Sequence, residues 1–320
     1  MYEVYPNVVN QIKRTLKQLN LELLTDPPEF FIEKKLRFYW AHCRTKKGEK
    51  VFFKSILKRE RNIKSRFINE INFLETLKKH PCHPLKDYVA KPFYSSTNFN
   101  FPYLCYKFMQ GKTKIRQDKF PKQELEKIAH TAKVISSSPS IGFHFIPKKP
   151  FFNYPFYKER IKLLLKNLSL EIDLRKRILK TIEQNKSLFK KVKPALAHGD
   201  YSEANILFRK NKIKLLDWEH IHLRNPLFDL VSFWVKRKKE PREQKQLFKA
   251  FDRIPYFEGL FKLALIELCL GELTFFQEMR AMANLEEKEG KEKKLIQKRR
   301  KSLKRQEKDT IVLLERELSS

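Results

Sequence analysis

The sequence predicts an α+β fold in which a small β-rich lobe precedes a larger, mostly helical lobe. Aromatic and β-branched residues fill short runs between Glu29 and Leu57, and such residues favour the pleated surface of a sheet. Beyond Gly111, apolar residues instead recur at helical spacing over several long segments. With 320 residues, 41% of them hydrophobic, the chain is long enough to fill the cores of both lobes.

The β-rich lobe is expected to span residues 25–110, after an N-terminal helix within residues 1–24. Residues 7–20 repeat apolar side chains at helical spacing until Asp26-Pro27-Pro28, where prolines end the helix. The expected elements of the lobe are three antiparallel strands (FFIEKKL, RFYWAHCRT and KVFFKSIL), one helix over 59–79, and strand-like pieces over 87–94 and 103–109.

The helical lobe is expected to span residues 111–283. Its predicted helices cover residues 122–136, 157–168, 174–190, 226–238, 244–251 and 258–283, and a short strand pair lies within ANILFRKNKIKLLDW. The remaining residues, 284–320, are mostly charged and carry apolar residues at their end. We interpret them as a solvated helix or frayed basic tail, with an anion-binding arm as the less favoured alternative.

The composition favours a cytoplasmic protein whose positive charge is a general surface property. Lysine and arginine number 69 against 37 acidic residues, which gives a net charge of +32, and 49 of the 69 are lysines. Nucleic-acid readers rely on arginine, so contact of the basic tail with nucleic acid or an anionic surface is not the favoured interpretation. The four cysteines lack paired spacing, and charged residues interrupt the most apolar late segment, so neither disulfides nor a membrane span is expected.

The segment 198–230 carries the chemistry. Phosphoryl transfer needs metal ions on the phosphate oxygens and a carboxylate that orients the attacking hydroxyl. His198-Gly199-Asp200 followed after four residues by Asn205 reproduces the catalytic-loop interval of protein kinases. The following strand pair ends at Asp217. This pattern predicts His198 and Asp200 as catalytic residues, with Asp200 as the base, and Asn205 and Asp217 as oxygen ligands for Mg²⁺.

The same segment resembles the aminoglycoside phosphotransferases and choline kinases, small-molecule kinases with a protein-kinase-like fold. The resemblance rests on HGDYSEANIL, LLDWEHI and NPLFDLVSF and covers roughly residues 29–283. It implies a two-lobed fold in which a small antiparallel sheet and one key helix form the N-lobe. It also implies that Asp229 braces the catalytic loop from a helix start.

Further nucleotide-binding residues follow from the resemblance. Lys54 in VFFKSI stands where this fold keeps its phosphate-binding lysine, and Glu70 stands where a helix glutamate pairs with that lysine. Glu75 and Glu60 are alternatives for the glutamate. PYLCYKFMQG resembles the connector between the lobes, whose backbone around Lys107, Phe108 and Met109 would bind the adenine edge of ATP, or the guanine edge of GTP.

Two positions depart from the family pattern. The first glycine of the chain is Gly48, so no glycine-rich loop lies between the first two strands, and Glu33-Lys34-Lys35 would occupy that turn. Lys34 or Lys35 would then supply charge to the phosphates in place of backbone amides. Glu203 stands where the family often has a proline or a small residue, and it could repel phosphate or select a substrate.

The predicted function is transfer of the γ-phosphate of ATP to a hydroxyl group of a small molecule. The acceptor stays open between a sugar, an aminoglycoside-like compound and an amino-alcohol. Glu267, Glu272 and Glu278 are candidates for binding a cationic acceptor, although exposed helix glutamates are the commoner explanation, and aromatic residues 151–157 could stack a sugar. The alternative function is a kinase-like scaffold whose basic tail contacts RNA or an anionic surface. A protein kinase is disfavoured because no APE-like segment follows DWE.

Overall fold

A five-stranded antiparallel sheet organises the first part of the chain. In this computed structural model the described residues are 7–33, 36–58, 60–115, 118–140, 142–146, 151–209, 212–249, 254–288 and 293–319. The strand order is β1-β2-β3-β5-β4. The strands are β1 (Leu21–Leu23), β2 (Phe38–Thr45), β3 (Lys50–Ile56), β4 (Pro92–Ser96) and β5 (Tyr103–Lys107). The β2–β3 turn contains Gly48 at a φ of 78°, a left-handed conformation that glycine adopts without strain.

The two faces of the sheet have different roles. Alternate residues of β2, namely Tyr39, Ala41 and Cys43, are fully buried in a core that helix α1 (Val8–Gln18) completes with Val8 and Ile12. The opposite face contacts α3 (Arg61–Lys79), where the rings of Phe38 and Phe67 meet edge to face. Lys54 lies on this second face because it follows the buried Phe53 by one residue and successive strand side chains alternate.

The predicted strand FFIEKKL is wrong. Pro28–Glu33 form helix α2, and the first strand, β1, lies earlier, within the residues assigned to the N-terminal helix. Proline is favoured at the first helical position, so Pro28 begins a helix here instead of only ending one. The connection between β1 and β2 therefore covers residues 24–37, and it contains no glycine. Lys34 and Lys35 lie outside the described residues.

The described chain divides into two units that differ from the predicted lobes. The first combines Met1–Ile115 with Ser138–Pro147 and His198–Ile221, so the segment around Asp200 and Asp217 groups with the five-stranded sheet. The second combines Arg116–Ser137, Lys148–Ala197 and His222–Ser320. The first unit also contains the 3-10 turns η1 (Pro84–Asp87), η2 (Glu203–Asn205) and η3 (Trp218–His220), and the hairpin of β7 (Ile206–Arg209) and β8 (Lys212–Leu215).

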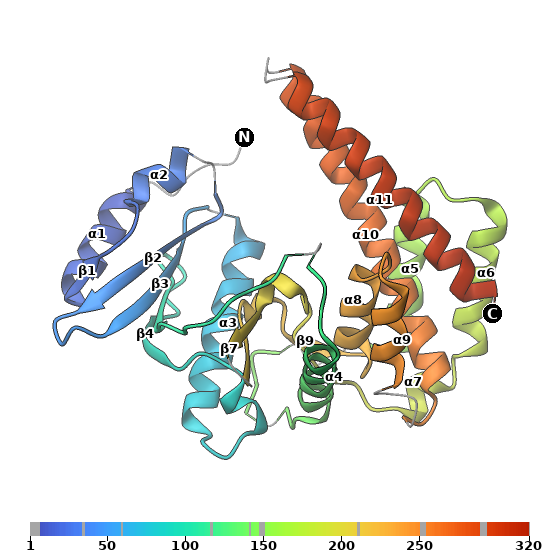
Figure 1. Cartoon of the computed structure of the whole chain (residues 1–320), viewed down its shortest axis with the longest axis horizontal. Helices are drawn as coiled ribbons and strands as arrows, with labels where there is room; N and C mark the ends of the chain where they lie inside the picture. The colour runs from blue at the N-terminus through green and yellow to red at the C-terminus, as the bar shows by residue number, and fades with distance from the viewer. Residues whose placement is uncertain are drawn as a thin grey trace. The chain divides into compact units, whose positions relative to one another are not determined.

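Helices dominate the second unit, as predicted. They are α4 (Lys122–Ser137), α5 (Tyr154–Asn167), α6 (Ile172–Gln184), α7 (Leu188–Lys191), α8 (Phe228–Lys236), α9 (Pro241–Lys249), α10 (Phe257–Lys288) and α11 (Lys293–Ser319). A short antiparallel pair joins β6 (Ala195–Ala197) to β9 (His222–Arg224). Figure 1 shows α10 and α11 as two long neighbouring helices, in orange and red.

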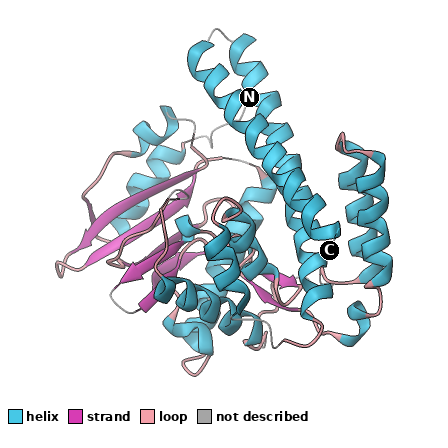
Figure 2. Cartoon of the chain, turned by 45° about the vertical axis from the view of Figure 1, so that its right-hand side comes forward, coloured by secondary structure: helices cyan, strands magenta, loops and turns pink. Residues whose placement is uncertain are grey.

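Residues 293–319 are helical, as the predicted basic helical tail requires, but the helix is packed and is neither solvated nor frayed. These residues form α11, which packs along α10; Figure 2 shows both as continuous helices. Ile296, Leu303, Leu313 and Leu314 are buried, so apolar positions recur along the helix although lysines and arginines separate them. Ion pairs such as Arg280–Glu307 and Arg300–Glu287 fix the antiparallel alignment of the two helices.

Candidate active site

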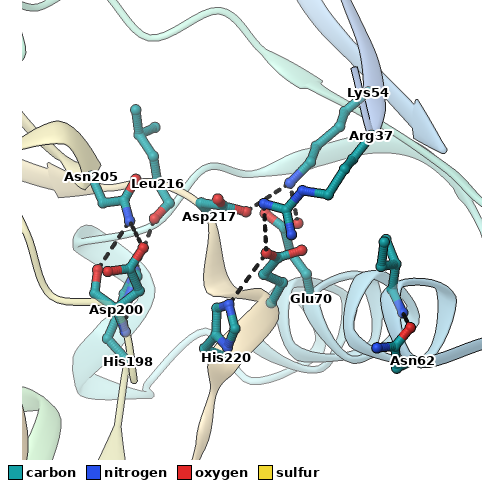
Figure 3. Close-up of polar contacts among 12 residues, drawn as sticks. Arg37, Lys54, Asn62, Glu70, His198, Asp200, Asn205, Leu216, Asp217 and His220 are labelled. Atoms are coloured by element: carbon teal, nitrogen blue, oxygen red, sulfur yellow. Dashed lines mark hydrogen bonds and ion pairs between the residues drawn. The ribbon is translucent and has the colours of Figure 1, made fainter. Parts of the chain in front are cut away.

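His198 ties the HGD loop to the strand that leads to Asp217. Its ring is fully buried, its Nε2 donates to the carbonyl of Leu216 at 2.8 Å, and its Nδ1 accepts the N–H of Asp200 at 3.3 Å. These two bonds define a neutral imidazole protonated on Nε2. His198 therefore holds the backbone at Asp200 beside the strand end, as Figure 3 shows.

Gly199 makes this loop possible. Its φ is +85°, and a Cβ at this position would lie 2.3 Å from the carbonyl oxygen of His220. A larger residue would meet backbone that has no freedom to move, in addition to the left-handed strain. The glycine between His198 and Asp200 is therefore required by the close approach of two chain segments within the first unit.

Asn205 fixes the carboxylate of Asp200. The Asn205 amide Nδ2 donates to both the carbonyl oxygen and the Oδ2 of Asp200, each at 2.9 Å (Figure 3). The backbone carbonyl of Asn205 accepts the N–H of Leu216 at 2.9 Å. With its nitrogen engaged on Asp200, the amide presents its Oδ1 on the other side, where oxygen is the atom a hard metal ion prefers.

Asp217 sits in a strained backbone conformation. Its φ of 60° and ψ of 67° are left-handed, which costs a non-glycine residue about 1 kcal/mol. The conformation turns the chain sharply from the end of β8 into η3, where the indole of Trp218 packs on Phe73 of α3 at 4.4 Å. This packing holds the Asp217 side chain toward Lys54.

Lys54 bonds to two carboxylates at once. Its Nζ lies 2.7 Å from Glu70 Oε2 and 2.8 Å from Asp217 Oδ1 (Figure 3). The Lys54 and Glu70 side chains are 10% and 3% exposed, whereas Asp217 is 37% exposed. The structure thus selects Glu70 from the three candidate glutamates; Glu75 accepts a hydrogen bond from Ser95 instead.

The electrostatics of this cluster follow from burial and from the shared ammonium. Burial lowers the pKa of Lys54, but the charges of Glu70 and Asp217 outweigh it and raise the pKa above its usual value, so the ammonium stays charged. Burial raises the pKa of Glu70 to about 7, and the nearby Asp217 adds to this while Lys54 opposes it. For Asp217, burial opposes ionisation, yet Lys54 prevails and the pKa is lowered. Asp217 is therefore an ionised, partly exposed carboxylate at neutral pH.

The connector residues are only partly available for a nucleotide base. The N–H groups of Lys107 and Phe108 donate to the carbonyls of Lys91 and Lys50, at 3.4 and 3.1 Å, as the edge bonds of β5. Among the predicted connector residues this leaves Met109 as the candidate amide for a base edge. The role of Lys107 as a backbone donor is weaker than the sequence suggested.

Sequence reasoning missed an aromatic surface beside Lys54. Phe52 stacks on Trp40 at 6.2 Å and on Tyr106 at 5.1 Å, and its edge meets the ring of His42 at 5.7 Å. Phe52 and Lys54 are two positions apart in one strand, so their side chains share a face. The alternation of side chains along β3 could therefore have predicted this aromatic surface from the sequence.

Three of the remaining predicted residues lie in the second unit. Asp229 is buried in the first turn of α8, where a carboxylate suits the helix dipole, and its predicted bracing role stays a prediction. Glu267 is 3% exposed and accepts hydrogen bonds from Arg160 and Arg224. Glu272 is paired with Lys238 at 3.0 Å. Glu267 and Glu272 are thus already neutralised by basic partners and are not exposed helix glutamates.

The fold and the site together define the class of protein. A small antiparallel sheet, its paired lysine and helix glutamate, an Asp–Asn loop and a partly exposed aspartate at a strand end are the parts of a protein-kinase-like phosphotransferase. Residues 44–260 match the sequence profile of the phosphotransferase enzyme family, APH, and the chain belongs to this family. The resemblance noted in the sequence, the fold class and the assignment as a phosphotransferase are therefore confirmed.

Solved structures agree at the level of the fold. The macrolide 2'-phosphotransferase MphH from Brachybacterium faecium has a TM-score of 0.61 at 15% identity, covering 82% of this chain and 91% of its own. A thermostable mutant of aminoglycoside phosphotransferase APH(4)-Ia has a TM-score of 0.55 at 10% identity, covering 96% and 98%. The Plasmodium vivax ethanolamine kinase has a TM-score of 0.51 at 14% identity, covering 83% and 78%. A comparison with curated protein sequences gives no match.

None of the helices within the described ranges combines the length and the apolar character that a bilayer crossing requires.

Proposed function

We propose that this phosphotransferase moves the γ-phosphate of ATP or GTP, bound with Mg²⁺, to a hydroxyl group of a small molecule. The observation that carries the proposal is the simultaneous bonding of Lys54 to Glu70 and Asp217, beside an Asp200 carboxylate that Asn205 holds in place. Such a costly arrangement of buried charges is expected where charged phosphates bind and react. The family membership supports phosphoryl transfer as the reaction type.

The residues present fit a magnesium ion. Asn205 offers its Oδ1, and Asp217 offers Oδ2, since its Oδ1 bonds to Lys54. Magnesium prefers oxygen ligands, usually takes one or two from protein, and keeps phosphate oxygens and water for the rest. No group of three or more His, Cys, Asp or Glu side chains suited to a metal occurs among the described residues, so a site built of protein ligands alone is not present there. When bound, the metal would neutralise charge on the phosphates.

The side chains of the site have separate roles in catalysis, in positioning and in nucleotide binding. Asp200 orients the acceptor hydroxyl and takes its proton as the hydroxyl oxygen bonds to the γ-phosphorus. The bond from that phosphorus to the bridging oxygen breaks, and ADP or GDP leaves with the electron pair. His198 has both ring nitrogens engaged with backbone groups, so we assign it a positioning role and not proton transfer. Lys54 would contact phosphate oxygens once the nucleotide competes for its ammonium. The aromatic face of Phe52, Trp40 and Tyr106 would stack the base.

The missing glycine-rich loop motivated the alternative of a scaffold without turnover. The structure places α2 in that connection and leaves Lys34 and Lys35 outside the described residues, so their proposed contact with phosphate stays a proposal. A free basic arm, which that alternative requires, is at odds with α11 being packed on α10. The cytoplasmic location likewise stays a prediction.

A two-stage experiment tests the proposal. Thermal melting with ATP or GTP, with and without Mg²⁺, should give a metal-dependent stabilisation of the wild type that Asp217→Asn lacks. Transfer from γ-labelled nucleotide to a panel of sugars, aminoglycosides and amino-alcohols should then give a labelled product. The proposed function would be refuted if the melting temperature is the same with and without the magnesium nucleotide and no acceptor receives label.

A further inference from the structure

Arg37 places a second positive charge beside Lys54. It is the last residue of the connection between β1 and β2, and its carbonyl accepts the N–H of Leu57 at 2.9 Å, which extends the β2–β3 ladder by one residue. The Cζ of Arg37 lies 5.7 Å from the ring centroid of Phe38, and the Nζ of Lys54 lies 4.7 Å from the same centroid. The two cations therefore share one ring and are close neighbours within the first unit, as Figure 3 shows.

The carboxylate that faces Arg37 is buried and poorly bonded. Nη2 of Arg37 lies 4.0 Å from Oε1 of Glu219, a long ion pair, and Nε2 of His220 lies 3.3 Å from the same oxygen. The Glu219 side chain is 3% exposed, and its Oε2 is buried without a hydrogen-bond partner in the part of the chain that the structure describes. A buried carboxylate is costly unless it is paired and hydrogen-bonded. So incomplete a pairing is uncommon in protein interiors and indicates a role other than stability.

The guanidinium of Arg37 has donors available for a ligand. A guanidinium carries five N–H donors, and the contact of Arg37 with an acceptor among the described residues is the long one to Glu219. The Arg37 side chain is 51% exposed, whereas that of Lys54 is 10% exposed and bonds to two carboxylates. Lys54 therefore has to exchange a short bond before it can contact a phosphate. Arg37 gives up only an ion pair of 4.0 Å.

The surroundings of Lys54 are otherwise acidic. Burial raises the pKa of Glu70, and the charges of Asp217 and Glu219 add to this, so both carboxylates lie within electrostatic reach of Glu70. The phosphates of a nucleotide bring further negative charge, of which a metal ion neutralises a part. One ammonium does not balance this excess, and a second protein cation beside it lowers the repulsion between the phosphates and the acidic residues.

The connection that ends at Arg37 lacks the usual backbone donors for phosphate. Protein kinases cover the phosphates with a glycine-rich loop, in which backbone N–H groups can approach closely. Residues 24–37 contain no glycine. A guanidinium offers an alternative set of donors, because its planar fork matches phosphate oxygens and its side chain spans several ångströms from the backbone.

We propose that Arg37 binds the nucleotide phosphates next to Lys54, and that Glu219 holds its guanidinium in place until the nucleotide arrives. This inference rests on the proposed function, because it adds a phosphate-binding residue to the same site. Binding exchanges the long contact with Glu219 for charge-assisted bonds from the guanidinium to phosphate oxygens. All of these residues belong to the first unit, together with Glu70 and Asp217.

The first test compares Arg37 with Arg44, at the other end of β2. Arg44 is 46% exposed and pairs with Glu22 at 3.7 Å, so it matches Arg37 in exposure and in the length of its ion pair. Calorimetric titration of MgATP should give a dissociation constant about tenfold higher for Arg37→Gln than for the wild type, the effect of one lost bond to a charged group. Arg44→Gln should bind as the wild type does. Equal affinity of wild type and Arg37→Gln, or equal losses in the two variants, would overturn the inference.

Adenosine separates binding of the phosphates from binding of the base. Because adenosine carries no phosphate, the shift in melting temperature that it causes should be the same in the wild type and in Arg37→Gln. If Arg37→Gln weakens adenosine as much as MgATP, the substitution has disturbed the base site or the start of β2, and Arg37 is not a phosphate ligand. Melting without nucleotide reports whether each variant is folded.

The role of Glu219 is tested through Arg37. Glu219→Gln removes the anion that competes with the phosphates, so it should tighten MgATP binding several-fold in the wild-type background. In the double variant with Arg37→Gln this gain should be lost, because the two residues act as a pair. A gain of the same size in both backgrounds would mean that Glu219 repels the phosphates directly and does not act by holding Arg37.

Failure of this inference can be told apart from failure of the proposed function. A wild type that neither binds MgATP nor transfers label to an acceptor removes the proposed function, and the role of Arg37 with it. A wild type that does both, with an Arg37→Gln variant that has the same affinity for MgATP, leaves the proposed function intact and removes only the role of Arg37.

Discussion

Each unit contains a buried cluster of three charged side chains. One cluster has two acidic members and one basic member, and the other has one acidic member and two basic members. In the first unit one ammonium, Lys54, lies between the carboxylates of Glu70 and Asp217. In the second, one carboxylate, Glu267, lies between the guanidiniums of Arg160 and Arg224. Each cluster has an inner pair that is almost fully buried and one outer member that reaches solvent, Asp217 at 37% and Arg160 at 31% exposure. The outer members carry opposite charge, so the first cluster presents a carboxylate to solvent and the second a guanidinium.

The largest expected effect comes from the outer member of the first cluster. Asp217→Ala should abolish transfer of the γ-phosphate, because it removes the proposed metal ligand and one of the two carboxylates that bond to Lys54. Loss of label transfer together with loss of the magnesium-dependent melting shift checks this outcome. If the variant keeps both label transfer and the magnesium-dependent melting shift, the first cluster has no role in phosphoryl transfer.

The next effect concerns the residue that Asn205 positions. Asp200→Asn should lower kcat by about 10² to 10⁴, the range for loss of a general base, while nucleotide affinity changes little. Steady-state kinetics and nucleotide titration measure the two quantities separately. Asn is close to Asp in size, so a fall in affinity as large as the fall in kcat would place Asp200 in nucleotide binding instead.

The inner carboxylate of the first cluster can be compared with a neighbour on its own helix. Glu70→Gln should lower kcat/KM by about 10²-fold, because Lys54 then loses a charged partner and its position. Glu75→Gln, on the same helix, weakens the bond to Ser95 and the partly exposed ion pair with Lys78, and it should stay near wild type. If kcat/KM falls equally in the two variants, activity is sensitive to any substitution in α3, and the Lys54–Glu70 pair has no specific role.

The packing of α11 on α10 can be tested by comparing a buried with an exposed position of α11. Leu314→Ala removes a fully buried side chain at this interface and should cost roughly 2–4 kcal/mol of unfolding free energy. Val312→Ala, two residues away and 52% exposed, should cost less than about 1 kcal/mol. Urea denaturation of both variants measures the difference, and equal midpoints would contradict the packing of the helix pair.

The smallest effect is a pH dependence that differs between the clusters. Burial lowers the pKa of His222 to about 4, against 6.5 for a free imidazole, so below pH 6.5 the unfolded chain gains a proton that the folded chain refuses. Stability should thus fall as the pH drops from 6.5 toward 4, by roughly 1 kcal/mol after allowance for solvent screening. In the first cluster two shifts have opposite signs. Asp217, whose pKa is lowered, loses stability only below its ordinary value of 3.8, whereas Glu70, whose pKa is raised to about 7, gains stability as the pH falls from 7 toward 4.5. Urea midpoints at pH 7 and 5 should differ less in His222→Gln than in the wild type.

The sequence predicted the site well where its residues lie close together in the chain, and poorly where they come from distant segments. Asp200, Asn205 and Asp217 lie within one short segment, so their spacing alone indicated their chemistry. The pairing of Lys54 with Glu70 followed only from the family resemblance, and Glu60 and Glu75, on or before α3, remained as alternatives. The arginine cluster combines three distant segments, and no local spacing signals it. Its carboxylate, Glu267, was considered a candidate for cationic acceptors, with an exposed helix glutamate as the favoured interpretation.

The fold errors have local physical causes. Pro27-Pro28 was interpreted as a helix stop, yet proline also suits the first turn, and α2 begins there with Phe31 buried under the sheet. FFIEKKL has strand-like composition, and tertiary packing prevailed over that propensity. In α11 the dense charges hid a buried stripe that includes Leu303 and Leu314. The long helices with uninterrupted apolar spacing were predicted well.

The first unit is assembled from chain segments that are far apart in the order of synthesis. Residues up to 115 supply the sheet, Lys54 and Glu70, but Asp200, Asn205 and Asp217 leave the ribosome only after about 80 further residues that mostly belong to the other unit. A nascent chain that stops near residue 190 therefore has an ammonium–carboxylate pair and an aromatic face with no reactive carboxylate beside them. Closing so long a loop is slow, which favours early folding of the sheet alone and late, abrupt appearance of phosphotransferase competence.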